Sequence, residues 1–215
     1  MAQAMFIGGR NVRVEFQGIY IIGSNASTYT FSGVAFGEAS PRRRIICGFD
    51  CTHLTANLTI PHTCTIGGVS AVRDYTNPPA TGGASQQFWS AAVPTGTSGT
   101  VTVQRAANMT HGALSVWAAY DLPGDSFVDG FDFFGNPAAD NLDTLASGIA
   151  VAFVVASSAS AVSWTGLTLD GALTGTGTAS GVTISAASRS KTTAGALAIQ
   201  ADQGANISLN AASYR

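Results

Sequence analysis

Cysteines and histidines in one short stretch are the residues whose types and spacing could do chemistry. Cys51 and His53 are two residues apart, as are His62 and Cys64, and on a β-strand such neighbours face the same way. If the two segments pair, four nitrogen and sulfur ligands converge, which is the tetrahedral set that zinc prefers. The spacing lacks the usual gap of two to four residues between ligands, and Pro61 disturbs the pairing. We therefore keep zinc as an alternative and expect no metal and no other cofactor.

The cysteines could instead form a disulfide among Cys47, Cys51 and Cys64. Three thiols cannot all pair within one chain, so one would stay free or join a second subunit. Disulfides persist in oxidising surroundings, such as those outside a cell. The remaining alternative is buried thiols that pack as small apolar side chains.

Acidic residues gather in a segment rich in Gly, Pro and Asn, where six aspartates lie between Asp121 and Asp143. Paired acids could hydrolyse glycosides and clustered acids could bind calcium, but the EF-hand spacing is absent. Aspartates in such a segment are usually solvated turn formers. The sequence also has no Gly-x-Ser-x-Gly elbow. We expect no catalytic residues and no enzyme.

Trp89, Trp117 and Trp164 are candidates for stacking on a glycan, because aromatic faces pack on sugar rings. The alternative is that they anchor the core, since two of them lie within strand patterns. Arg42, Arg43 and Arg44 could form forked contacts with an acidic neighbouring subunit. Their alternative is a solvated turn with one arginine packed along the sheet.

The strands that position these residues follow one repeated pattern. In Ser85–Arg105 an apolar stretch is followed by the turn residues TGTSG and then by Val101 and Val103 alternating with polar residues. This pattern predicts an antiparallel hairpin. Similar short strands recur at 10–15-residue spacing without helical periodicity. They predict an all-β fold, an antiparallel β-sandwich or jelly roll, with two packed β regions.

Turn-rich stretches suggest boundaries along the chain. Residues 1–25 are expected to form an N-terminal arm or edge strand, 26–122 a first β-sandwich region, 123–144 a connecting segment and 145–215 a second β region packed on the first. The longest apolar run, GIAVAFVVA, is shorter than the ~20 residues that cross a bilayer, and no signal peptide is visible. We expect a protein made in a cytoplasm, without a membrane partner.

Charge excludes one further class of partner. Only 10% of residues are charged, against roughly 25% in an average protein, and the formal net charge is −2. Nucleic acid is not expected as a partner, because binding phosphates needs clustered basic charge. Such a neutral, hydroxyl-rich surface suits secreted modules and the densely packed subunits of virions.

Several segments taken in order resemble a family of tailed-phage virion proteins. They are TYTFSGVAFGEASPRRRIIC (28–47), TIGGVSA (65–71), FWSAAVPTGTSGTVTV (88–103), ALSVWAAYDL (113–122), SWTGLTLD (163–170) and ISAASR (184–189). The resemblance covers residues 28–213 and implies a jelly-roll or sandwich subunit in a head-decoration, collar or tail position. It carries over no catalytic residues. The chain departs from the family pattern in having three arginines at 42–44 instead of one, and in its three cysteines.

These observations lead to one expected function and one alternative. We expect a structural component of a tailed bacteriophage particle, located in the virion, that contacts other virion proteins and copies of itself as a homo-oligomer. The alternative is a carbohydrate-binding module that attaches the particle to a host cell envelope.

Overall fold

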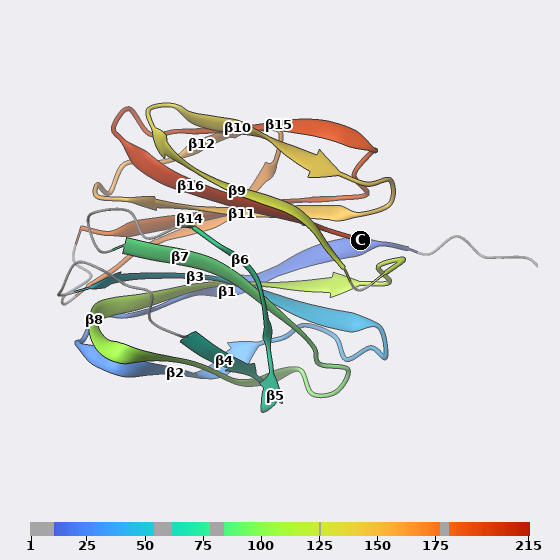
Figure 1. Cartoon of the computed structure of the whole chain (residues 1–215), viewed down its shortest axis with the longest axis horizontal. Coiled ribbons are helices and arrows are strands. Elements are labelled where there is room, and N and C mark those ends of the chain that lie inside the picture. The colour runs from blue at the N-terminus through green and yellow to red at the C-terminus, as the bar shows by residue number, and fades with distance from the viewer. Residues whose placement is uncertain (1–10, 54–61, 78–83, 125, 177–180) are drawn as a thin grey trace, which may run out of the picture.

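The computed structural model describes residues 11–53, 62–77, 84–124, 126–176 and 181–215, and every regular element in these ranges is a β-strand. The strands stack in four layers (Figure 1). One eight-stranded sheet curls into a nearly closed barrel and supplies layers 1 and 2. A five-stranded and a three-stranded sheet supply layers 3 and 4. The predicted all-β antiparallel fold with two packed β regions is confirmed.

The barrel region contains the first eight strands. These are β1 (Arg13–Ile22), β2 (Ala26–Ala35), β3 (Arg43–His53), β4 (His62–Ile66), β5 (Val69–Ser70), β6 (Val72–Thr76), β7 (Ala84–Ala92) and β8 (Ser98–Tyr120).

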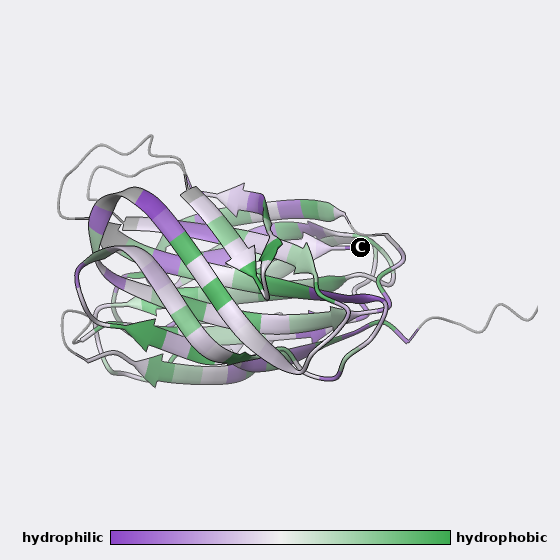
Figure 2. Ribbon diagram, turned by 90° about the horizontal axis from the view of Figure 1, so that it is seen from below, coloured by the Kyte–Doolittle hydropathy of each residue, from purple (hydrophilic) through white to green (hydrophobic). Residues whose placement is uncertain are grey.

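Strand β8 connects the two layers of the barrel, because its 23 residues pass from layer 1 into layer 2. Its first half pairs with β2 on one edge and β4 on the other. Its second half pairs with β1 and β3. Seen from the layer 1 side, apolar and polar residues alternate along the curved strands (Figure 2). This period-2 pattern gives each strand one face for the barrel interior.

The sandwich region contains the other eight strands. These are β9 (Phe127–Gly135), β10 (Ala138–Thr144), β11 (Ile149–Ala156), β12 (Ser163–Thr165), β13 (Thr168–Thr174), β14 (Thr183–Ser190), β15 (Gly195–Asp202) and β16 (Ile207–Tyr214). Layer 3 has the order β13-β14-β11-β16-β9, and layer 4 has the order β10-β15-β12.

Three apolar cores separate the four layers. The barrel core lies between layers 1 and 2, and the sandwich core lies between layers 3 and 4. The third core, here called the seam, joins the two regions between layers 2 and 3. There Phe88 and Phe153 meet edge to face at 5.3 Å, and a Cβ on Gly48 would lie 2.5 Å from the Phe153 ring. Glycine at position 48 therefore lets the two sheets pack closely.

The predicted hairpin is wrong, although both of its strands exist. β7 pairs with β3 and β6 in layer 2, whereas the start of β8 pairs with β2 and β4 in layer 1. The turn between them is held by long-range bonds: the amide of Val93 donates to Arg43 and that of Phe36 donates to Thr97. It is therefore a corner between two layers.

One further stretch differs from the sequence interpretation. Segment 123–144 was expected to be a connection, but it contains β9, which pairs with β16, and β10, which pairs with β15. Packing of alternate phenylalanines overrides the turn preference of its Gly and Asp residues. Within residues 1–25, the described strand β1 pairs with β8 of its own chain and with no other strand, which agrees with the edge-strand alternative. The described residues form no helix of the length and apolarity that a membrane span needs.

Candidate functional site

The three cysteines lie in the barrel core. Cys47, Cys51 and Cys64 are all free and buried, so the disulfide alternative is not formed in this structure. Burial raises the pKa of Cys51 and of Cys64 to about 12 and that of Cys47 as well. A thiol that stays protonated at neutral pH is a poor nucleophile and a poor metal ligand. Cys47 and Cys64 therefore pack as small apolar side chains, the third alternative from the sequence, whereas the Cys51 sulfur also accepts a hydrogen bond of 3.0 Å from Arg105.

The zinc alternative depends on His53 and His62, whose side chains lie outside the described residues. Their backbones pair with neighbouring parts of β8, at Met109 and Arg105 respectively. Among the side chains that the structure describes, no group of three or more His, Cys, Asp or Glu residues could hold a metal ion.

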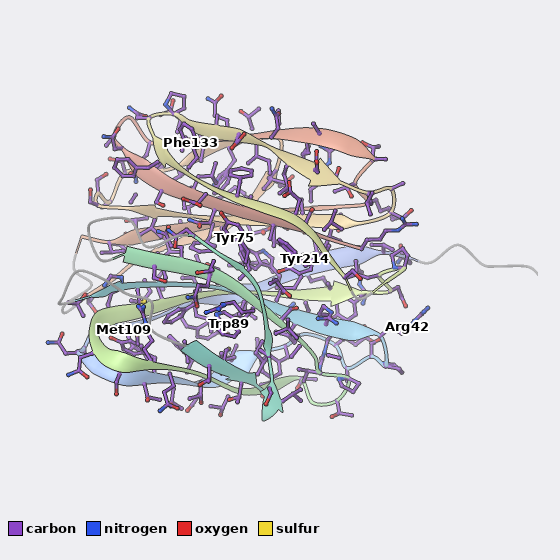
Figure 3. All side chains as sticks on the ribbon, in the orientation of Figure 1. Arg42, Tyr75, Trp89, Met109, Phe133 and Tyr214 are labelled. Atoms are coloured by element: carbon purple, nitrogen blue, oxygen red, sulfur yellow. The ribbon has the colours of Figure 1, made fainter. Side chains whose placement is uncertain are left out.

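The three consecutive arginines have three different environments. Arg42 is exposed and projects from one end of the molecule (Figure 3). Arg43 is 1% exposed, and Arg44 is half-buried and donates to Ser90 Oγ at 2.8 Å. Only Arg42 is therefore free to contact a neighbouring subunit, because the other two side chains point into the protein.

The Arg43 guanidinium organises the corner between β7 and β8. It donates five hydrogen bonds of 2.7–3.0 Å, all to backbone carbonyls, those of Gly37, Glu38, Val93, Thr95 and Gly96. A planar group with five donors in a fixed fork suits this task better than a lysine ammonium would. The arginine thus ties the chain after β2 to the chain after β7.

Two of the three tryptophans are too deeply buried to stack on a sugar. Trp89 and Trp117 are 4% and 0% exposed. Trp89 donates its Nε1–H to Gln87, and Trp117 donates to Asp170. Trp164 is half-buried, packs on the sandwich core and donates to Ser185. Glycan stacking on Trp89 and Trp117 is excluded by this burial, and the core alternative accounts for all three.

Aspartates of the 121–143 segment serve separate structural contacts. Asp129 accepts a hydrogen bond from the Asp143 amide, and Asp132 accepts one of 2.6 Å from the Tyr75 hydroxyl. Asp140 accepts from the next amide along the chain. The paired-acid geometry of a glycosidase does not arise from these contacts.

A buried His–Asp pair escaped the sequence analysis. His111 Nε2 lies 3.0 Å from Asp50 Oδ2, and the Thr110 hydroxyl lies 3.3 Å from His111 Nδ1. The residue types match those of a hydrolase triad. However, the His111 and Asp50 side chains are only 4% and 2% exposed, so a substrate does not reach them. The pair joins β3 to the bend of β8. Its two residues are far apart in the sequence, and no pattern of spacing indicates that they meet.

Polar side chains fasten the seam at several points. Gln86 Oε1 accepts hydrogen bonds from Asn77, Ser208 and Asn210. The Tyr214 hydroxyl donates to Asp74, while Trp117 and Ser188 both donate to the Asp170 carboxylate. Burial raises the pKa of Asp74 and of Asp170, and the hydrogen bonds they accept oppose that shift. Hydrogen bonds across the seam thus fix the barrel region and the sandwich region in one orientation.

Among the described residues, large apolar side chains remain on the surface at four places, one of which is Leu145 after β10. Phe133 and Phe134 near the end of β9 are 40% and 70% exposed and, as neighbours on a strand, face opposite sides of layer 3; we call them the aromatic knob. Phe133 lies at the top of the stack (Figure 3). Leu169 and Leu173 are exposed on β13, the opposite edge of layer 3. Val69 and Val72 are exposed around β5 and β6.

A hollow of about 330 Å³ opens beside β5, at the bottom of the stack in Figure 1. Its apolar lining comes from Phe36, Val69, Val93 and Pro94, and glycines 67, 68 and 99 form much of the rest. A Cβ on Gly99 would lie 2.5 Å from the Phe36 ring, and Gly67 and Gly68 have positive φ angles. Glycine is therefore required where these turns approach the ring. We call this feature the glycine hollow.

No known protein-family model matches this sequence, and no curated protein matches it. The structure is that of an all-β protein whose barrel and sandwich regions are joined by the apolar contacts and hydrogen bonds of the seam. Its described residues present packing surfaces, an aromatic knob and an apolar hollow.

Proposed function

We propose that this chain is a structural, non-enzymatic subunit of a tailed-phage particle that works through contacts with other virion proteins and with copies of itself. The observation that carries the proposal is the exposure of large apolar side chains, above all Phe134 at 70%, on a protein with only 10% charged residues. Exposed large apolar side chains on a protein surface are often sites of protein contact. The resemblance of residues 28–213 to phage virion proteins adds the kind of particle.

Rigidity also supports this role. The four layers share three cores, and the polar contacts of the seam fix the two regions against each other. A subunit that repeats in a symmetric assembly needs one shape, because each copy has to present the same surfaces. The carbohydrate-binding alternative has less in its favour, since two of its candidate tryptophans, Trp89 and Trp117, are buried and Trp164 is half-buried against the sandwich core.

Particle composition tests the proposal. Phage particles produced in a host that expresses this sequence are purified on a density gradient and analysed by quantitative mass spectrometry. We expect peptides of this chain to co-purify in a fixed ratio to the major capsid protein, and antibodies against the chain to decorate intact particles in electron micrographs. Particles that lack the chain while the cell lysate contains it would overturn the proposal.

A further inference from the structure

An apolar groove of about 420 Å³ lies at the end of the molecule that carries the C-terminus, and we call it the terminal groove. Pro123, Phe127, Val128 and Leu145 supply its apolar walls, and Arg215 also lines it. Leu145 is 39% exposed, and Phe127 and Val128 are half-buried. Removing such apolar surface from water is favourable, so a second apolar segment gains free energy by covering the groove.

One wall of the terminal groove connects the start of β1 with the C-terminus. Arg13 pairs with Tyr120, so the chain that follows Tyr120 leaves the barrel next to the point where β1 begins. This chain then reaches Ser126, which exchanges two backbone hydrogen bonds of 2.9 and 3.0 Å with Arg215. Figure 1 shows the C-terminus and the beginning of β1 at the same end of the stack. The groove wall at Pro123 therefore lies between these two points.

Residues 1–10, MAQAMFIGGR, precede the first described residue and carry three consecutive large apolar side chains, Met5, Phe6 and Ile7. These lie four to six residues before Asn11, so an extended chain carries them roughly 13–20 Å. Val14 of β1 bonds to Ser190 of β14, and β14 is two to three strands from the groove side of layer 3. The span is therefore one sheet spacing of about 10 Å and two to three strand spacings of about 5 Å, which is within that reach.

Size and tether length favour the segment of the same copy as the occupant. A cavity of about 150 Å³ accommodates a benzene ring, so the terminal groove has room for the side chains of Phe6 and Ile7. A short tether holds a segment near its own site at an effective concentration on the order of 1 mM. At a protein concentration of about 1 μM, the segment of a second copy is roughly a thousandfold more dilute.

We propose that Met5, Phe6 and Ile7 pack in the terminal groove of their own copy. Phe127, which lines the groove, also packs edge to face on Tyr214 of the seam at 5.9 Å. The docked segment thus extends the seam core to the surface beside the C-terminus. This inference goes beyond the proposed function and does not depend on it, because the contact forms within one chain.

Alkylation of a thiol placed in the groove tests the contact. In the full-length Leu145→Cys protein, iodoacetamide should label the introduced thiol about tenfold more slowly than in the same protein with Phe6→Ser and Ile7→Ser; this ratio follows from an effective concentration near 1 mM and a dissociation constant near 0.1 mM. The native cysteines are buried and give no background. The matched control is Leu173→Cys, at a position 42% exposed on β13, where labelling should not respond to the two serine substitutions.

Chymotrypsin tests the same contact from the side of the segment, with the native cysteines unchanged. Leu145→Asp places a charge in the groove and should accelerate cleavage after Phe6 about tenfold, for the same reason. Mass spectrometry measures this cleavage as loss of the first six residues. Leu173→Asp is the matched control and should be cleaved at the wild-type rate.

Protein concentration separates the possible occupants when both measurements are made at about 1 μM and about 100 μM. Protection that is equal at the two concentrations supports docking within one copy. Protection that rises with concentration shows that a second copy supplies the segment, and it overturns the inference. Equal labelling with and without the serine substitutions, or equal cleavage of Leu145→Asp and Leu173→Asp, overturns it as well. Particle composition is measured separately, so failure of this contact is distinguishable from failure of the proposed function.

Discussion

The barrel region and the sandwich region are both antiparallel β, yet their cores are built from different side chains. Among the described residues, the barrel core holds six buried aromatic residues and two alanines. The sandwich core holds one buried aromatic residue and seven alanines. Large side chains fill the wide interior of a curled sheet, whereas alanines allow two sheets to pack with little space between them. The barrel should therefore be sensitive to truncation and the sandwich to enlargement.

Truncation of an aromatic residue in the barrel should have the largest effect. Phe49 is fully buried there, and Phe49→Ala should lower the free energy of unfolding by about 3–5 kcal/mol through lost burial and the cavity that remains. Urea unfolding followed by circular dichroism measures the change. Phe134→Ala, at an exposed position, is the control and should change stability by less than about 0.5 kcal/mol. Equal effects at the two positions would contradict the burial described here.

Loss of the arginine fork should come next. Arg43→Lys keeps the charge but has three donors for five carbonyls, so we expect a loss of roughly 2–3 kcal/mol in unfolding free energy. Arg42→Lys, one residue earlier and exposed, should be nearly neutral. The two variants are compared in the same urea titration. A neutral Arg43→Lys would show that the corner between β7 and β8 does not depend on the fork.

Enlargement in the sandwich should have a smaller but clear effect. Ala152 lies fully buried between layers 3 and 4, and Ala152→Leu should destabilise by about 1–3 kcal/mol because the added atoms have no space. Ala172→Leu on the exposed strand β13 is the matched control. If Ala152→Leu were tolerated as well as Ala172→Leu, the close packing inferred from the alanines would be incorrect.

Two buried acids of the seam should give the smallest effect, visible as a pH dependence. Burial raises the pKa of Asp74 and of Asp170 above 3.8, so between that value and the raised one the folded chain binds more protons than the unfolded chain. Stability from these groups therefore falls as the pH rises through this window. The double variant Asp74→Asn, Asp170→Asn should lose that part of the dependence. Urea midpoints of both proteins from about pH 4 to about pH 8 measure the difference; parallel curves would contradict it.

Thiol protection gives a qualitative comparison of the two regions, because all three cysteines lie in the barrel. Iodoacetamide should not label Cys47, Cys51 or Cys64 in the native protein, since burial keeps the thiols protonated and inaccessible. Labelling should appear at the same urea concentration as the loss of the circular dichroism signal, to which the strands of both regions contribute, because the seam couples the regions. Labelling that precedes this loss would show that the barrel opens alone.

Local patterns predicted much of the fold and little of its topology. The alternation of Leu114, Val116 and Ala118 against Trp117 is typical of a strand, and in β8 the first three pack in the barrel core while Trp117 packs in the seam. The turn after Val93 was recognised, but its outcome depends on Arg43, which lies fifty residues earlier and binds the turn carbonyls. A hairpin and a corner between layers have the same local sequence. Only the long-range contact decides between them.

Candidate sites were harder to predict because they depend on burial. Cysteine, arginine and tryptophan are chemically versatile, and their spacing says nothing about which layer covers them. Cys51 and Trp117 are inside, and so is Arg43. The aromatic knob lies in a segment that was assigned to a connection, and the glycine hollow combines two turns that are distant in sequence. The run of phenylalanines from 127 to 134 was the one signal that could have indicated a strand there.

The position of β16 has a consequence for synthesis on the ribosome. This last strand of the described chain lies between β11 and β9, inside layer 3. The barrel strands are complete once Tyr120 has been made, whereas layer 3 waits for Tyr214. At about 5–20 residues per second that interval lasts roughly 5–20 s, during which the face of layer 2 that bears Ile46 and Phe88 has no cover. A nascent chain thus exposes a broad apolar sheet, so chaperone binding and premature association between nascent chains compete with closure of the seam.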